Sequence, residues 1–168
     1  MNEKIQELMN ATRPMTIGLI AKEIGCTDLK AAQMLGSEHC VFARDVDVFD
    51  DLWEAMSKWE KVTLFIHHEG HVFEIASKLS SGKRGMGYYN IFDKDAVVGG
   101  HINADALGAI AFISMPFMRR ESHYVAFFGK DEKSHFCVYV GRENHQLIDS
   151  VKKGFMDAKN QFGTKENA

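Results

Sequence analysis

The opening of the chain shows apolar residues at helical spacing, three and four positions apart. This pattern covers residues 3–11 and 17–35 and predicts two or three short helices. Thr16 is placed to cap the second of them, Gly25 to end it, and Thr27 or Asp28 to cap the next. The opening third of the chain is therefore expected to be mainly helical.

After these helices, the spacing of apolar residues along the chain changes. Residues 39–44 read as a strand, whereas residues 47–59 return to helical spacing and carry aspartates at the start, which suit the positive end of a helix dipole. The buried face of this second helical segment should contain Phe49, Leu52, Trp53 and Met56.

From residue 62 onward, runs of β-branched and aromatic residues alternate with short polar turns. They predict about seven strands, at residues 62–68, 71–77, 86–92, 96–102, 107–114, 124–129 and 134–140. Short separators favour consecutive antiparallel pairing, so we expect an antiparallel meander. An amphipathic segment at residues 143–162 predicts a C-terminal helix packed on the sheet.

These elements predict an α+β fold in one domain covering residues 1–168. It comprises a mainly helical cap at 1–60, an antiparallel sheet at 61–142 and the helix at 143–162. At 168 residues and 19.0 kDa, a single domain is the expectation, because chains usually divide only beyond this length.

Composition narrows the function classes. The net charge of −3, with −5 carried by the first 60 residues, argues against a general polyanion binder. The chain starts without a secretory pattern, and its longest apolar run is interrupted by glycine, serine and proline, so neither export nor membrane insertion is expected. The chain has three cysteines, Cys26, Cys40 and Cys137. Because their number is odd and they are widely spaced, they indicate reduced thiols, and we expect a cytoplasmic protein.

Residues 16–35 have the spacing of a helix-turn-helix, which raises a DNA-binding regulator as one hypothesis. The second helix offers Lys30 and Gln33 for base contacts, but also Asp28, within an acidic region. A small helical cap on the sheet is therefore the favoured interpretation, and nucleic acid is an unexpected partner.

Residues 67–71 read HHEGH, and imidazoles are common metal ligands. The spacing does not match HExxH, because a glycine turn separates His68 from His71. In an extended strand His67 and His68 face opposite sides, so only one of them can face a given pocket. The alternative interpretation is polar residues at a hairpin tip.

Two glycine-containing segments complete the candidate chemistry: GKRGMGYYN at residues 82–90 and VVGGHI at 97–102, which contains His101. Glycines allow a ligand to approach the backbone of a sheet, although a bulge and a core histidine would explain them equally well. No nucleophile elbow, P-loop, CxxC pair or CxxCH motif is found, so catalytic residues are not predicted.

Read in order, the blocks FDDLWEAMSKWEKVT, SSGKRGMGYYN, GGHI, PFMRRESHYVAFF and YVGRENHQL resemble the ChuX/HutX family of haem-utilisation proteins, relatives of HemS and ChuS. The resemblance implies an α+β fold that forms a homodimer through its sheet. It also implies non-covalent binding of haem b and transfer to a haem-accepting or haem-degrading partner. A carrier without enzymatic activity is the leading hypothesis, and a haem-degrading enzyme of the HemS/ChuS type is the alternative.

The same resemblance implies the site residues. The haem-iron candidates are His67, His101 and Tyr88, with Tyr89 as the neighbour of Tyr88 and His68 as the neighbour of His67. Imidazole and phenolate are both axial ligands of ferric haem. Four basic residues are candidates for pairing with the propionates, because their charge complements carboxylates: Lys83, Arg84, Arg119 and Arg120. Arg142 also lies in a matching block, without an assigned role.

Overall fold

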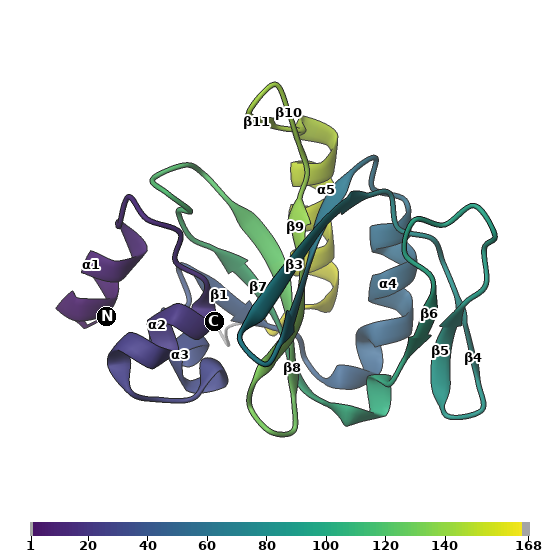
Figure 1. Ribbon diagram of the computed structural model, residues 1–168, viewed down its shortest axis with the longest axis horizontal. Helices are drawn as coiled ribbons and strands as arrows, with labels where there is room; N and C mark the ends of the chain where they lie inside the picture. The colour runs from purple at the N-terminus through teal and green to yellow at the C-terminus, as the bar shows by residue number, and fades with distance from the viewer. Residues whose placement is uncertain (1, 166–168) are drawn as a thin grey trace.

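A computed structural model describes residues 2–165 as three layers built around a large antiparallel sheet (Figure 1). Three N-terminal helices cover one face of this sheet. Two longer helices, together with a small second sheet, cover the other face. The α+β fold predicted from the sequence is confirmed.

The N-terminal layer contains α1 (Glu3–Met9), α2 (Ile17–Ile24) and α3 (Asp28–Met34). The Thr16 hydroxyl accepts a hydrogen bond from the Leu19 N–H at 3.2 Å, and Thr27 caps α3 in the same way through Lys30. Gly25 ends α2 in the left-handed region, at φ +83°. The predicted caps Thr16, Gly25 and Thr27 are confirmed, whereas α1 ends at Met9 and not at residue 11.

The large sheet has six antiparallel strands in the spatial order β1, β7, β8, β9, β2, β3. Their bounds are β1 (Cys40–Phe42), β2 (Val62–His68), β3 (His71–Ser77), β7 (Leu107–Ser114), β8 (His123–Gly129) and β9 (Ser134–Val140). The pairing of β2 with β9 brings together strands far apart in sequence. The C-terminal segment closes the edge at β1 through a bridge between Ala43 and Gly163, whereas β3 forms the opposite edge.

The expected single meander is wrong, because the chain leaves the large sheet after β3. The next strands, β4 (Lys83–Gly85), β5 (Tyr88–Ile91) and β6 (Gly100–Ile102), form a separate three-stranded sheet. The physical reason is burial. By turning away, β5 packs Tyr89 against Phe49 and Trp53, a contact that a position beyond β3 would not provide.

The predicted helix at 143–162 is too long at its start. Helix α5 runs over Asp149–Phe162, and the preceding residues form a hairpin of β10 (Arg142–Glu143) and β11 (Gln146–Leu147). Asn144 and His145 adopt φ values of +50° and +65°, the left-handed conformations of a two-residue turn that a right-handed helix excludes. The second helical segment is confirmed as η1 (Val46–Val48) and α4 (Phe49–Ser57), with η2 (Ala104–Ala106) before β7.

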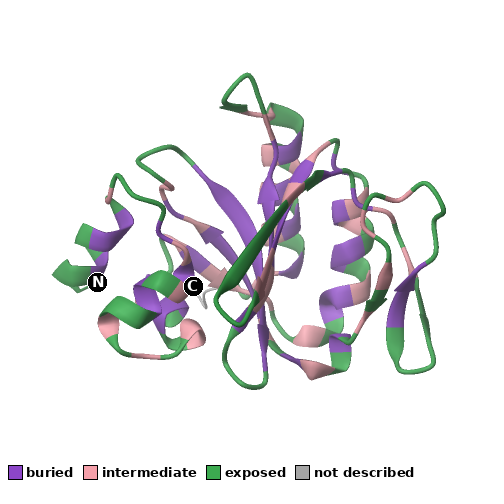
Figure 2. Ribbon diagram, in the orientation of Figure 1, coloured by how far each residue is buried: buried purple, intermediate pink, exposed green. Residues whose placement is uncertain are grey.

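The central strands of the large sheet are buried on both faces, and every residue of β8 is buried, whereas β3 at the edge is mostly exposed (Figure 2). Along β7, Ile110 and Phe112 point into the core beneath α4 and α5, whereas Ala111 and Ile113 join the core beneath the N-terminal helices. Helix α4 buries the face expected from its sequence, Phe49, Leu52, Trp53 and Met56. The alternation of strand side chains thus fixes two separate cores.

Two glycines in helices differ in the space around them, so replacing each by alanine should have opposite effects on stability. A Cβ atom at Gly154 of α5 would lie 2.5 Å from Nε1 of the buried Trp59, whereas one at Gly18 of α2 would lie 3.6 Å from its nearest neighbour. We predict that Gly154→Ala lowers the free energy of unfolding by about 1–3 kcal/mol through overpacking. Gly18→Ala should raise it by up to about 1 kcal/mol through helix propensity. Urea denaturation measures both, and equal effects would contradict the described packing.

Candidate functional site

A cavity of about 420 Å³ lies between the large sheet and the small one. Its size falls within the range of small-molecule sites. Its polar lining residues are His101, Asn103 and His135. Most of its wall is apolar and comes from α4, β2, β7, β9 and the β5–β6 region: Trp53, Leu64, Ile66, Ile91, Val98, Ile102, Leu107 and Phe136.

His101, on β6, is the exposed imidazole of this cavity. Its ring makes edge-type contacts with two aromatic rings, with centroid distances of 5.9 Å to Tyr88 and 5.7 Å to Phe92. Tyr88 and Phe92 are 44% and 74% exposed, so apolar surface extends from the cavity to the outside of the small sheet. The structure therefore brings the predicted residues His101 and Tyr88 together.

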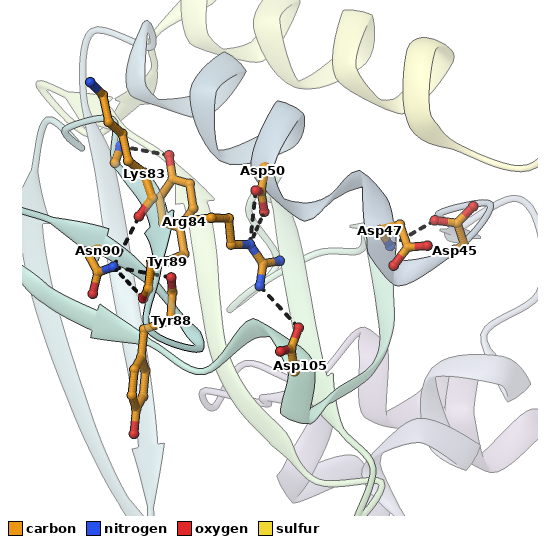
Figure 3. A network of polar contacts seen from close by, with 11 residues as sticks. Asp45, Asp47, Asp50, Lys83, Arg84, Tyr88, Tyr89, Asn90 and Asp105 are labelled. Atoms are coloured by element: carbon orange, nitrogen blue, oxygen red, sulfur yellow. Dashed lines mark hydrogen bonds and ion pairs between the residues drawn. The ribbon is translucent and has the colours of Figure 1, made fainter.

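Asn90 connects His101 to the β4–β5 hairpin. Its Oδ1 lies 2.6 Å from Nδ1 of His101, and it is buried. Its Nδ2 donates to the carbonyl oxygens of Lys83, Gly85 and Tyr88 at 3.2, 2.9 and 3.3 Å (Figure 3). The β4–β5 hairpin turns at residues 86–87, where both φ values are positive. This tight turn places the three carbonyl oxygens close to the Asn90 amide.

The two neighbouring tyrosines face opposite sides of β5. The Tyr89 ring is 2% exposed and packs on Phe49 and Trp53, and its hydroxyl accepts the Gly82 N–H at 2.7 Å. Burial raises the pKa of the Tyr89 phenol, which favours its neutral form. Tyr88 is the tyrosine that faces His101.

The two predicted basic residues of β4 differ in their partners. Arg84 donates from Nε to Asp50 of α4 at 2.8 Å and from Nη1 to Asp105 at 3.1 Å (Figure 3). These ion pairs engage the Arg84 guanidinium within the protein, and the pair with Asp50 attaches the small sheet to α4. Lys83 is exposed and has no ion pair within residues 2–165, so its ammonium group is available to an anionic ligand.

His67 lies on the opposite face of the large sheet. In β2, Leu64 and Ile66 line the His101 cavity, so by alternation the His67 side chain points toward the N-terminal helices. There it contacts Sγ of Cys137 at 3.8 Å and lines a second cavity of about 650 Å³. Burial lowers the pKa of His67, and nearby Asp28 opposes this shift. His67 and His101 are therefore not ligands of one site within a single chain.

The other histidines of the HHEGH segment form a hairpin tip, as expected. His68 pairs with His71 across a turn at Glu69 and Gly70, whose φ values of +49° and +82° suit a two-residue hairpin loop. Within the described chain, no three His, Cys, Asp or Glu residues are arranged to hold a metal ion.

The remaining arginines lie away from both histidines. Arg119 and Arg120 belong to the β7–β8 loop, at the end of the sheet opposite to the β2–β3 turn. Arg119 donates to the Asn10 carbonyl at 3.2 Å, and Arg142 donates to the Glu121 carbonyl. The structure does not bring Arg119 or Arg120 together with His101.

The helix-turn-helix shape exists, but its second helix is docked on the protein itself. Asp28 accepts the backbone N–H of Ser134 at 2.8 Å, and the Leu29 N–H donates to the Glu132 carbonyl at 3.1 Å. The first turn of α3, the part that contacts bases in such motifs, is thus occupied by the β8–β9 turn. This agrees with the interpretation of the segment as a cap on the sheet.

Sequence reasoning missed three residues of the site: Asn90, Phe92 and His135. For the first two a signal existed, because residues 88, 90 and 92 alternate along one strand and share a face with Tyr88. His135 had no such signal, since a bulge in the pairing of β8 with β9 at this position changes the local register.

The protein has an α+β fold with an apolar cavity between its two sheets, at which the imidazole of His101 is exposed. The chain belongs to the ChuX/HutX haem utilisation family, whose sequence profile matches residues 43–154. The matched region contains the small sheet, every strand of the large sheet except β1, and every residue of the His101 site.

Individual relatives agree with this assignment. The chain is 28% identical over 149 residues to the "Intracellular heme transport protein HutX" of Vibrio cholerae, covering 88% of this chain and 77% of that protein. The solved structure of the heme-binding protein ChuX superimposes with a TM-score of 0.79 at 26% identity, covering 94% of this chain and 98% of ChuX. An Erwinia carotovora protein gives a TM-score of 0.83 at 28% identity, covering 94% and 98%.

More distant structures share the fold alone. Holo-PhuS from Pseudomonas aeruginosa is 14% identical, with a TM-score of 0.73, covering 90% of this chain but only 44% of PhuS. This chain therefore corresponds to less than half of the PhuS chain.

Among residues 2–165, the helices are all too short or too polar to cross a membrane.

The lowered pKa of His67 predicts a pH dependence of stability. Folded His67 binds a proton less readily than it does in the unfolded chain, so protonation below about pH 6.5 favours unfolding. The free energy of unfolding should therefore fall between about pH 7 and pH 5.5, and His67→Gln should flatten this slope. Urea titrations at several pH values measure it. His71→Gln, at the exposed hairpin tip, is the matched control, and an unchanged slope in His67→Gln would contradict the argument.

Proposed function

We propose that this protein is an intracellular haem carrier, which binds haem b non-covalently at the His101 cavity and passes it to a haem-using or haem-degrading protein. The observation that carries the proposal is the exposed imidazole of His101 at the opening of an apolar cavity, flanked by Tyr88 and Phe92. An imidazole is a standard axial ligand of haem iron, and apolar walls suit a porphyrin. Membership in a haem-utilisation family supports the same cargo.

Within this proposal each residue has a role. His101 ligates the iron, and Tyr88, on the same face of β5, is the alternative ligand that would favour ferric haem through its phenolate. Lys83, on the adjacent strand β4, attracts the propionates. His67, in the second cavity, is the candidate ligand if haem is held on the opposite face of the sheet.

A carrier is favoured over an enzyme for two reasons. Among the described residues, the cavity lining contains the imidazoles of His101 and His135, the amide of Asn103 and apolar side chains, with no carboxylate to complete the acid and base pair typical of catalytic centres. The name of the HutX relative describes transport. ChuS, described as a heme-degrading enzyme, is 14% identical, so it supports the fold and not the activity.

Hemin titration tests the proposal. The wild-type protein should give a saturable, shifted Soret band, and His101→Ala should weaken binding by at least about tenfold, the lower limit seen when even outer-shell partners of a metal site are lost. Tyr88→Phe should change the ferric spectrum if the phenolate is a ligand. His67→Ala should leave affinity and spectrum unchanged, because this residue lies on the other face.

The controls separate the alternatives. If His67→Ala removes binding while His101→Ala does not, the site belongs to the second cavity. If adding a reductant under oxygen destroys the porphyrin spectrum faster than it does for free haem, the protein is an enzyme and the carrier proposal is wrong.

We also propose that two copies pair through strand β3. Its outer edge has no strand partner within residues 2–165, and Val72 and Phe73 are 46% and 57% exposed. Proteins rarely leave an apolar edge strand uncovered, and a two-fold dimer is the commonest way to cover it. Pairing of two β3 strands would join the two large sheets into one.

Sedimentation velocity at micromolar concentration tests this arrangement. The wild-type protein should sediment as a dimer of the 19.0 kDa chain, and Phe73→Lys should shift the population toward monomer by placing a charge on the edge strand. Val97→Lys is the matched control, because Val97 is equally apolar and 67% exposed but lies in the β5–β6 connection. A wild-type monomer would contradict the proposal.

A further inference from the structure

The orientation of the Asn90 amide is determined by its surroundings. One end of the amide faces three backbone carbonyl oxygens, those of Lys83, Gly85 and Tyr88. Carbonyl oxygens only accept hydrogen bonds, so the NH₂ group must occupy this end. Oδ1 is therefore the atom that faces His101, at 2.6 Å from Nδ1.

This orientation has a consequence for the proton on His101. Oδ1 carries no hydrogen, so the 2.6 Å contact is a hydrogen bond only if Nδ1 of His101 is the donor. A neutral imidazole has one N–H, and placing it on Nδ1 leaves the lone pair on Nε2. Within residues 2–165, His101 has no other hydrogen-bond partner that could favour the opposite tautomer.

We propose that Asn90 is a positioning residue that holds His101 in the Nδ1–H tautomer and presents Nε2 as the ligand atom. The link to iron rests on the proposed function, whereas the tautomer itself does not. Histidines that bind metals are typically oriented by such a hydrogen bond from the second ring nitrogen. Here the orienting group is a neutral amide, itself fixed by the turn at residues 86–87.

The aromatic neighbours complete the orientation. Tyr88 and Phe92 approach the imidazole edge to face, at interplanar angles of 65° and 70°. Tyr88, Asn90 and Phe92 are alternate residues of one segment, so the same strand that supplies the hydrogen bond also restrains rotation of the ring. The site is thus preorganised by residues 88–92 before any ligand arrives.

The direct test is ¹⁵N NMR of the imidazole nitrogens in the haem-free protein, at about pH 8.5, where histidines are ordinarily neutral. In the wild-type protein the proton should be found on Nδ1 of His101, with Nε2 unprotonated. Finding the proton on Nε2 would overturn the proposal, whatever the protein binds. Because this measurement needs no variant and no haem, it is independent of the outcome of the hemin titration.

Variants then test the role of the amide. Asn90→Leu removes the acceptor and should give a mixture of tautomers in a protein whose fold is checked by circular dichroism. In hemin titrations Asn90→Leu should bind about 10–100-fold more weakly, with an altered Soret band. Asn103→Leu, in the same cavity wall, is the control and should keep the wild-type tautomer.

Two results separate the inference from the function on which it rests. In the first, NMR finds the Nδ1–H tautomer, but His101→Ala leaves haem binding unchanged. This result supports the positioning role of Asn90 and rejects His101 as the iron ligand. Wild-type tautomer and wild-type affinity in a folded Asn90→Leu protein would overturn the positioning role, even if haem binds at His101.

Discussion

The fold depends on one constraint: the central strands of the large sheet are apolar on both faces, so each face must be covered. Strand β8 is inaccessible along its whole length, and its neighbours send alternate residues into two different cores. The N-terminal helices cover one face. Helices α4 and α5, with the small sheet, cover the other. Side chains adjacent in sequence on a central strand consequently belong to different compartments of the molecule.

The candidate site follows from how incompletely the second face is covered. The small sheet contacts α4 through Tyr89 and through the Arg84 ion pairs, and it does not close fully on β2 and β9. The apolar cavity is the space left between the two sheets. His101 and Tyr88 lie on the small sheet at the opening of this space, so the proposed ligand-binding groups are separate from the side chains that hold the main core together.

Local features of the fold could be predicted from the sequence, and long-range ones could not. Thr16, Gly25 and Thr27 define helix ends through contacts with near neighbours, and β2 and β3 were found from their composition and turn. The departure of residues 83–102 into a second sheet was missed, because strand composition does not specify the partner strand. For the candidate site, the sequence predicts Tyr88 and His101, which the structure places side by side, and their role in haem binding stays a prediction. The position of His67 on the opposite face could not be predicted, because it depends on which helices cover each side. Asn90 lies in no distinctive motif of its own. Its part in the site comes from the hydrogen bond with His101, eleven residues later in the chain.

The docking of α3 on the β8–β9 turn has a consequence for synthesis of the protein. Asp28 accepts its hydrogen bond from Ser134, 106 residues later in the chain, and β1 pairs with β7. At about 5–20 residues per second, the ribosome needs at least several seconds to make the intervening segment. During that time the amphipathic N-terminal helices have no sheet to cover. The nascent chain therefore exposes their apolar faces until β9 emerges, and this is the interval in which a chaperone would have most to bind.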